Sequence, residues 1–246
     1  MNIHIFYHIA MVGRWKDVVE EQVLRLASRG PRNAPVFAYA VGPESLFDEC
    51  KSLISKDNFV LQYGGPLDNF EFPALQGLHD FSIQQGTGHL LYLHTKGVSK
   101  FATPHDVPCT DWRRFMEHSV IDNYLECIKL LEHCDACGAN FVVDHSWGTH
   151  FSGNMWWTKA EYVKTLPVPR SSSNRYDAER WICSKQGRFA STVKNEAAGY
   201  DHLLPEWRYA DAERTKRPSG KAPGWIRRWI RNRLSEVTGT RKKQDL

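Results

Sequence analysis

The sequence lacks the long apolar run of a membrane-spanning helix, which needs about 20 consecutive apolar residues. Residues 1–8 show no basic segment followed by an apolar stretch and a cleavage site, so they do not resemble a secretory signal peptide. These two absences predict a cytoplasmic protein whose six cysteines are reduced thiols.

Common metal and nucleotide motifs are also scarce. Cys134 and Cys137 form a lone CxxC pair, and no second pair completes a tetrahedral zinc site. The HTKG loop at residues 94–97 lacks the glycine spacing and the following Ser or Thr of a P-loop. Residues 7–13 make a poor glycine-rich loop, which argues against a nucleotide-binding α/β enzyme of the methyltransferase kind.

A strong charge imbalance is absent as well. The 32 Lys and Arg residues exceed the 28 Asp and Glu residues by only four in a chain of 246 residues. With no ladder of arginines and aromatics, this balance predicts no nucleic-acid partner. The composition is otherwise typical of a globular protein that buries a sizeable core.

Strands and helices alternate regularly in the first 100 residues. Short apolar runs predict four strands, at residues 3–9, 35–41, 59–63 and 89–94. Amphipathic segments between them predict three helices, at residues 15–28, 44–54 and 72–84. This order predicts an α/β fold with a mainly parallel sheet and helices on both of its faces.

The second half of the chain is less regular. Periodicity predicts helices at residues 111–134, 159–166 and 176–184, and strands at residues 139–143 and 150–157. After Pro205 the chain becomes polar, as a linker would. We therefore expect one domain over residues 1–204, then a linker and a basic amphipathic tail over residues 205–246.

The tail at residues 222–234 has the pattern of a helix that lies on a membrane. On a helix, Trp225 and Trp229 fall on one side, and Arg228 and Arg231 fall mostly on another. This pattern predicts peripheral contact with anionic lipid at the inner face of the membrane. The alternative is a helix that packs its tryptophans on the main domain.

Three segments carry side chains suited to chemistry. The HTKG loop follows a predicted strand, where ligands of parallel sheets bind, and Lys96 can meet a phosphate; the alternative is a turn with a surface lysine. In residues 150–157, HFSGNMWW, the tryptophans suit sugar rings and the polar residues can hydrogen-bond them; the alternative is a core strand. Asp177 and Glu179 are candidates for a general base, or they only stabilise a helix start.

Together, LYLHTKG at residues 91–97, HFSGNMWW at 150–157 and RYDAERWI at 175–182 resemble a family of small glycosyltransferases. The family occurs in bacterial surface-polysaccharide clusters and large DNA viruses, and the resemblance covers residues 1–185. It implies a single GT-A-like, Rossmann-like domain that uses a nucleotide-diphosphate sugar. Residues implied to hold the donor are His8, Glu71, His94, Thr95, Lys96 and Gly97. Residues implied to shape the sugar and acceptor site are Ser152, Gly153, Asn154, Trp156, Trp157 and Tyr176.

One departure from this family pattern concerns the metal ion. A GT-A enzyme usually has Asp-x-Asp after its fourth strand to hold a metal on the diphosphate, and here that strand ends in HTK. Lys96 could supply part of the charge, or His94 and His150, with Asp144, could hold Mn²⁺ or Mg²⁺.

The predicted activity is transfer of a hexosyl or deoxyhexosyl group in surface-polysaccharide synthesis. The acceptor would be a glycan or a lipid-linked glycan, and either stereochemical outcome remains open. The alternative is a carbohydrate-binding protein without catalysis, which the missing Asp-x-Asp supports.

Overall fold

The computed structural model describes residues 1–54, 57–144, 146–192, 203–206 and 209. The chain separates into two compact units, Met1–Tyr209 and Ala210–Leu246. The tail predicted at residues 222–234 lies outside the described residues. Within the described ranges, no helix is long and apolar enough to cross a membrane.

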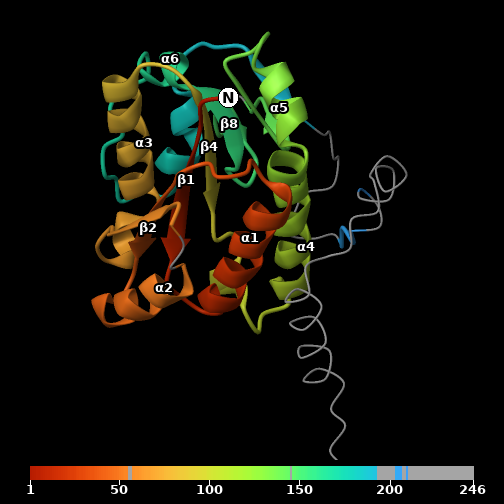
Figure 1. Cartoon of the computed structure of the whole chain (residues 1–246). Coiled ribbons are helices and arrows are strands. Elements are labelled where there is room, and N and C mark those ends of the chain that lie inside the picture. The colour runs from red at the N-terminus through yellow and green to blue at the C-terminus, as the bar shows by residue number, and fades with distance from the viewer. Residues whose placement is uncertain (55–56, 145, 193–202, 207–208, 210–246) are drawn as a thin grey trace, which may run out of the picture. The chain divides into compact units, whose positions relative to one another are not determined.

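The described strands of the first unit form a seven-stranded sheet and a two-stranded sheet (Figure 1). The large sheet has the order β3-β2-β1-β4-β8-β5-β9. Its strands are β1 (Ile3–Ala10), β2 (Val36–Val41), β3 (Phe59–Tyr63), β4 (His89–His94), β5 (Ala136–Gly138), β8 (Trp156–Lys159) and β9 (Phe189–Ser191). Of these described strands only β8 is antiparallel to its neighbours, so the predicted α/β class with a mainly parallel sheet is confirmed. The small sheet pairs β6 (Phe141–Val142) with β7 (His150–Phe151).

Helices pack on both faces of the large sheet, and each face has its own apolar core. The helices of the first core are α1 (Trp15–Arg29), α2 (Phe47–Leu53), α4 (Asp106–Glu117) and α5 (Tyr124–Leu130). The helices of the second core are α3 (Phe72–Gln85), α6 (Ala160–Val163) and α7 (Tyr176–Arg180). Short 3-10 helices cover Glu44–Leu46, Leu67–Asn69, Val98–Lys100 and Trp181–Cys183, and a π-helix covers His118–Asp122. Strand β1 sends Ile5, Tyr7 and Ile9 into the first core and Phe6 into the second.

Two predictions of secondary structure are corrected, and one strand was missed. The strand expected at residues 139–143 is present only as the short β6 of the small sheet, and the large sheet contains β5 instead, where Cys137 pairs with Trp157 and with Ala190. The helix expected at residues 111–134 begins at Asp106 and is interrupted by the π-helix. Strand β9 was not predicted, since three residues are too few for a clear pattern.

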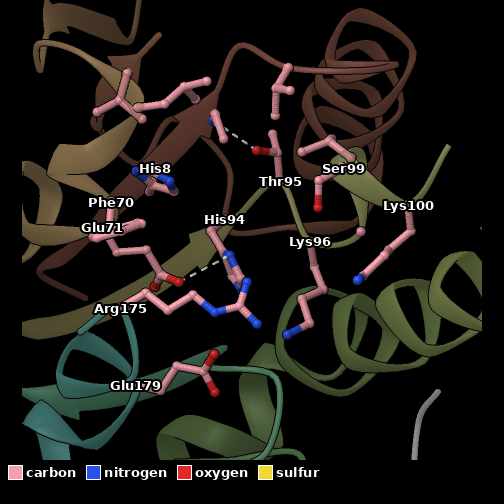
Figure 2. Close-up of a pocket in the computed structure, with 16 residues that line it drawn as sticks. His8, Phe70, Glu71, His94, Thr95, Lys96, Ser99, Lys100, Arg175 and Glu179 are labelled. Atoms are coloured by element: carbon pink, nitrogen blue, oxygen red, sulfur yellow. Dashed lines mark hydrogen bonds and ion pairs between the residues drawn. The ribbon is translucent and has the colours of Figure 1, made fainter. Parts of the chain in front are cut away.

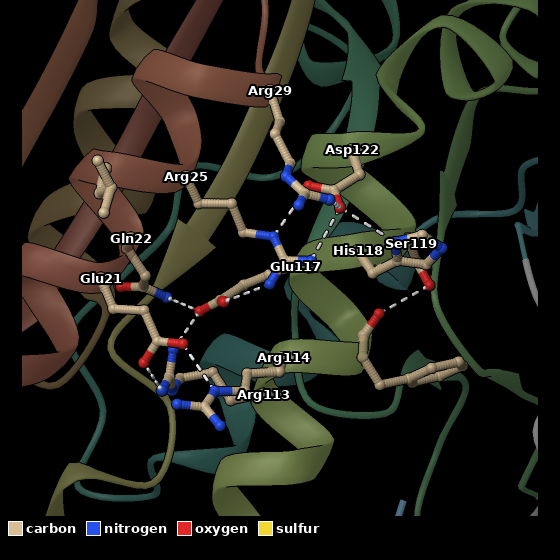
Figure 3. Close-up of polar contacts among 12 residues, drawn as sticks. Glu21, Gln22, Arg25, Arg29, Arg113, Arg114, Glu117, His118, Ser119 and Asp122 are labelled. Atoms are coloured by element: carbon tan, nitrogen blue, oxygen red, sulfur yellow. Dashed lines mark hydrogen bonds and ion pairs between the residues drawn. The ribbon is translucent and has the colours of Figure 1, made fainter. Parts of the chain in front are cut away.

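Buried ion pairs join α1 to the helical segment that begins with α4 (Figure 3). The Arg113 guanidinium donates to Glu117 at 2.6 Å and to Glu21 at 2.7 Å, and its side chain is 1% exposed. One turn further on, Arg25 donates to both carboxylate oxygens of Asp122 at 2.9 Å. These contacts join α1 to α4 and to the π-helix that follows it.

Gln22 connects this network to the sheet. Its side-chain amide donates to Glu117 at 2.7 Å and to the main-chain oxygen of His94 at 3.0 Å. Its own oxygen accepts a hydrogen bond from the Tyr7 hydroxyl at 2.6 Å. All the hydrogen-bonding capacity of the amide nitrogen is thereby used, and the last residue of β4 is fixed in position.

Candidate functional site

A cavity of about 320 Å³ opens at the carboxyl ends of β1, β2 and β4 (Figure 2). The chain forms β2 and β3 on one side of β1 and then returns to place β4 on the other side. Such a switch point in a parallel sheet separates the loops that follow the two central strands, and a crevice results. The position of the cavity therefore follows from the strand order.

All six residues predicted to hold a donor line this one cavity. They are His8, Glu71, His94, Thr95, Lys96 and Gly97. They come from β1, from the position just before α3, and from the end of β4 with the loop that follows it, which are far apart in the sequence. The structure brings them together, and their role as donor ligands remains a prediction.

The HTKG loop is held by main-chain and side-chain contacts. The Thr95 amide donates to the His8 carbonyl at 3.1 Å, and the Thr95 hydroxyl accepts from the Ala10 amide at 2.9 Å. Gly97 has a φ of +83°, a left-handed conformation that favours glycine. The Lys96 ammonium lies 4.7 Å from the centre of the Trp112 ring, in a cation–π contact. The loop thus presents Lys96 from a defined backbone.

Glu71 is anchored by two hydrogen bonds to one carboxylate oxygen. The Tyr92 hydroxyl donates to it at 2.6 Å and the Asn154 amide at 2.5 Å. Glu71 precedes α3 but makes no side-chain cap there, so helix capping does not explain it. Burial and the Glu71 charge raise the pKa of Tyr92 well above its usual range, which keeps the hydroxyl protonated as a donor.

Two neutral histidines flank Glu71. Burial lowers the pKa of His8 to about 4, although the Glu71 charge opposes the shift. Burial and the charge of Lys96 likewise lower the pKa of His94 to about 4. The His94 Nε2 lies 2.8 Å from the Gly153 carbonyl oxygen, which can only accept, so we place the proton of the neutral ring on Nε2. Its Nδ1 then faces the second Glu71 oxygen at 3.6 Å.

A second cavity of about 360 Å³ adjoins the first. The two share Lys96, Lys100, Arg175 and Glu179 as lining residues. Aromatic side chains form much of the remaining wall, and they are Trp112, Trp147 and Tyr176. The Trp147 and Tyr176 rings are 5.2 Å apart at 73°, an edge-to-face contact. This wall combines flat apolar faces with charged groups at its border to the first cavity.

The structure separates the two carboxylates predicted as a general base. Glu179 lines both cavities, and within the described part of the chain its carboxylate makes no hydrogen bond or ion pair. Asp177 lines neither cavity, and its carboxylate accepts hydrogen bonds from Ser172, Asn174 and Arg180. Asp177 therefore organises the loop before α7, and Glu179 is the carboxylate that reaches the site.

The segment at residues 150–157 divides between the cavity and the core. Ser152 and Gly153 line the second cavity, as does Tyr176 from the same predicted group. Trp156 and Trp157 are fully buried in the central sheet, so the prediction that their rings face a sugar is wrong. The Trp157 indole donates to the Val120 carbonyl, and the Trp156 indole donates to Asn154.

Asn154 is also completely buried, so direct contact with a sugar is corrected to a supporting role. Its oxygen accepts from Trp156 at 2.7 Å while its nitrogen donates to Glu71, and its φ is +54°. An asparagine tolerates this left-handed conformation better than most residues. Asn154 thus links Trp156 of the central sheet to the Glu71 carboxylate and helps to fix the orientation of that carboxylate.

The three predicted metal ligands do not form one ligand set. His94 Nε2 contacts Gly153, and His150 Nδ1 lies 2.8 Å from the Gly148 carbonyl oxygen. Asp144 accepts hydrogen bonds from the Ser146 side chain and from two main-chain amides of its own turn. Among the residues that the structure describes, no group of three or more His, Cys, Asp or Glu is arranged to hold a metal ion. The donor set present therefore fits a resident divalent ion poorly.

Several lining residues were not singled out from the sequence. Lys100 lies four residues after Lys96, and Arg175 was part of the RYDAERWI segment but was given no role of its own. Trp147 lies in an irregular stretch, where neither periodicity nor a motif marks it. The usable sequence signals were the proximity of Lys100 to the HTKG loop and the place of Arg175 in the RYDAERWI segment, whereas the position of Trp147 depends on how distant loops meet.

Comparison with known proteins yields one family and several distant structures. A family described as a domain of unknown function (DUF8361) matches residues 4–213. A cytidylyltransferase from Leptospira borgpetersenii is 10% identical with a TM-score of 0.45, over 100% of this chain and 99% of that one. HddC from Yersinia pseudotuberculosis is 10% identical with a TM-score of 0.44, over 88% and 100%. A candidate nucleotide-diphospho-sugar transferase from Desulfovibrio desulfuricans G20 is 11% identical with a TM-score of 0.38, over 77% and 79%. No curated protein matches the chain.

Proposed function

We propose that this chain, which belongs to the DUF8361 family, is a glycosyltransferase that uses a nucleotide-diphosphate sugar. The observation that carries the proposal is the pair of adjoining cavities that meet at Glu179. A group-transfer enzyme must hold a donor and an acceptor side by side, with a proton acceptor between them. A protein that only binds carbohydrate has no need for the second compartment.

The first cavity suits the nucleotide part of the donor. Apolar side chains at the ends of β1 and β2, including Val12 and Val41, form one side of it. Lys96, Lys100 and Arg175 lie where the cavity meets the second one. A diphosphate placed against these cations would have its charge neutralised by lysine and arginine side chains. The sugar would then extend toward Glu179 and the aromatic wall.

The proposed chemistry is a direct displacement. The acceptor hydroxyl attacks the anomeric carbon while Glu179 takes its proton, and a new carbon–oxygen bond forms. The bond between the anomeric carbon and the phosphate oxygen breaks, and its electron pair leaves with the nucleoside diphosphate. Lys96, Lys100 and Arg175 stabilise the charge that develops on the leaving group. A single displacement of this kind inverts the anomeric centre.

The remaining parts of the proposal rest on the sequence. The acceptor is a glycan or a lipid-linked glycan in surface-polysaccharide synthesis, and the transferred group is a hexosyl or deoxyhexosyl residue. The catalytic domain spans residues 1–204, and the basic tail contacts an anionic membrane from the cytoplasmic side. Dependence on Mn²⁺ or Mg²⁺ is part of the test below.

The test is donor turnover with a panel of UDP-, GDP- and dTDP-sugars, with and without Mn²⁺ or Mg²⁺. We expect release of nucleoside diphosphate and transfer to an acceptor glycan, and loss of both in Glu179→Gln by about 100-fold or more. Asp177→Asn is the matched control on the same helix, and it should retain most of the activity. Equal activity of the two variants would refute the assignment of Glu179, and glycan binding without nucleotide binding would favour a lectin.

A further inference from the structure

The structure contains a third hollow that shares no lining residue with the two cavities of the proposed active site. It is a groove of about 550 Å³ between α3 and the strands β2 and β3. Helix α3 packs on β1 and β2, so the face of the edge strand β3 beside it stays open. Val60 on β3 is 49% exposed for this reason.

One side of the groove is a continuous row on α3. Gln76, Asp80 and Gln84 are spaced four residues apart, which puts them on one face of the helix at intervals of about 6 Å. The Gln76 amide donates to Asp80 at 2.8 Å, which links the first two groups of the row. These groups can both donate and accept hydrogen bonds along the length of the groove.

The floor of the groove is aromatic. Phe37 and Phe6 are stacked with centres 5.2 Å apart, and Phe81 of α3 lies 5.6 Å from Phe37. Phe37 and Phe81 are only partly buried, so their rings contribute accessible surface. At one end of the groove Tyr63 is 37% exposed.

A notch in α3 places a tyrosine hydroxyl in this floor. Gly77 stands in the middle of the helix, where glycine costs about 1 kcal/mol relative to alanine. A Cβ at this position would overlap the Tyr39 hydroxyl, so the glycine admits the Tyr39 ring. Within the described part of the chain this hydroxyl makes no hydrogen bond, which leaves it available to a ligand in the groove.

The charge of the groove differs from that of the active-site cavities. Among the described residues no lysine, arginine or histidine lines it, and Asp80 is its charged group. Phosphate and carboxylate ligands are therefore disfavoured. Flat rings beside amide, hydroxyl and carboxylate groups instead match a neutral sugar, whose ring faces are apolar and whose edge carries hydroxyls.

We propose that this groove binds a neutral segment of an oligosaccharide at a second site, away from the reacting groups. The spacing of about 6 Å along Gln76, Asp80 and Gln84 is comparable to one pyranose ring with its linkage. Several successive sugars could thus meet the same set of contacts. This inference goes beyond the proposed transfer reaction and does not depend on it.

The test uses the full chain on an array of neutral and acidic glycans, followed by calorimetry with a neutral glycan that is retained. We expect Phe81→Ala to lower the affinity about tenfold or more, and Gln84→Ala about threefold to tenfold. Gln85→Ala is the matched control, because Gln85 is exposed on the same helix and does not line the groove. Thermal unfolding identifies any variant that has lost its fold, and Gln84→Ala at the helix surface should keep it.

Two further comparisons separate the possible outcomes. Saturation with a nucleoside diphosphate, or the substitution Lys100→Ala, should leave glycan binding to the groove unchanged. Retention of no neutral glycan, or an affinity in Phe81→Ala and Gln84→Ala that equals the affinity of the control Gln85→Ala, would overturn the proposal. Self-association of the chain that Phe81→Ala abolishes would also overturn it, in favour of a second copy as occupant.

Discussion

Two regions of this protein are rich in charge, and they differ in how the charges are paired. Between α1 and α4, Arg113 and Arg25 meet carboxylates at 2.6–2.9 Å in a buried network. At the strand ends, Lys96, Lys100 and Arg175 line an open cavity with Glu179. The carboxylate of Glu71, in the same cavity, is already engaged by Tyr92 and Asn154.

The difference shows why residue type alone does not identify a functional charge. A buried arginine between two carboxylates has exchanged its water for protein partners, and it has no surface left for a ligand. A lysine on the wall of a cavity keeps accessible surface that a ligand can contact. The buried network supports the geometry of the site through Gln22 and His94, while the cavity carries the proposed chemistry.

The largest effect should come from opening the buried network. Arg113→Ala leaves Glu21 and Glu117 without their shared partner, and we expect a loss of about 3–5 kcal/mol in the free energy of unfolding. Arg114→Ala is the matched control, because Arg114 donates to the same Glu21 but is 43% exposed. It should cost at most about 1 kcal/mol. Urea denaturation measures both, and similar values for the two variants would contradict the distinction.

A smaller effect, of a different kind, is expected in the cavity. Lys100→Ala removes a cation from the proposed diphosphate site, and affinity for a nucleoside diphosphate should fall about 10- to 100-fold. Unfolding by urea should be unchanged, in contrast to Arg113→Ala. Lys129→Ala is the control, since Lys129 forms an exposed pair with Glu126 on α5. Calorimetry with UDP, GDP and dTDP is the measurement, and equal affinities in both lysine variants would argue against the site.

The smallest effect is expected in how the free energy of unfolding depends on pH. Each group can change it by at most about 1.4 kcal/mol per pH unit. The pKa of His8 and His94 is about 4 in the folded chain, below the usual 6.5. Below pH 6.5 the unfolded chain therefore binds protons that the native state does not, and stability falls toward pH 4. Burial raises the pKa of Glu21, but Arg113 and Arg114 outweigh it and lower the pKa to about 2 from 4.5.

The Glu21 contribution is present above pH 4.5 and is lost as the pH falls toward 2. The two regions should thus lose stability in different windows. Urea denaturation at a series of pH values is the measurement. The substitution His8→Gln should reduce the loss of stability between pH 6.5 and 4, and Glu21→Gln should reduce the loss between pH 4.5 and 2. A wild-type profile that is level between pH 6.5 and 4 would contradict the burial of neutral histidines in the cavity.

Most of the first half of the fold was predictable from local sequence. The strands at β1–β4 agree with prediction to within a residue at each end, as do the helices at α1 and α3. Each has a pattern that is complete within its own segment, since apolar runs or helical periodicity identify the buried positions. The later strands were not predictable in this way. The three residues of β5 are recognisable as a strand only through their partners in β8 and β9.

The candidate site was predictable in part, for the same reason. The HTKG loop could be placed at a ligand-binding edge because it follows an apolar strand. The tryptophan pair could not be placed, because the same residues suit a core and a pocket wall. Its central position in the sheet depends on the antiparallel insertion of β8 between β4 and β5. Likewise Asp177 and Glu179 have similar local sequence, and only the packing of α7 directs Glu179 to the cavities.

The sequence by itself determined the alternation of strands and helices, the mainly parallel sheet and the edge of that sheet at which the first cavity opens. Periodicity and chain connectivity are sufficient to predict these features, because the apolar pattern within each segment already marks which of its side chains are buried. Only the tertiary structure decided which charges are paired in the core and which face a cavity, and it buried Trp156 and Trp157. Those outcomes depend on contacts between segments far apart in the chain, such as Glu21 with Arg113 and Glu71 with Asn154.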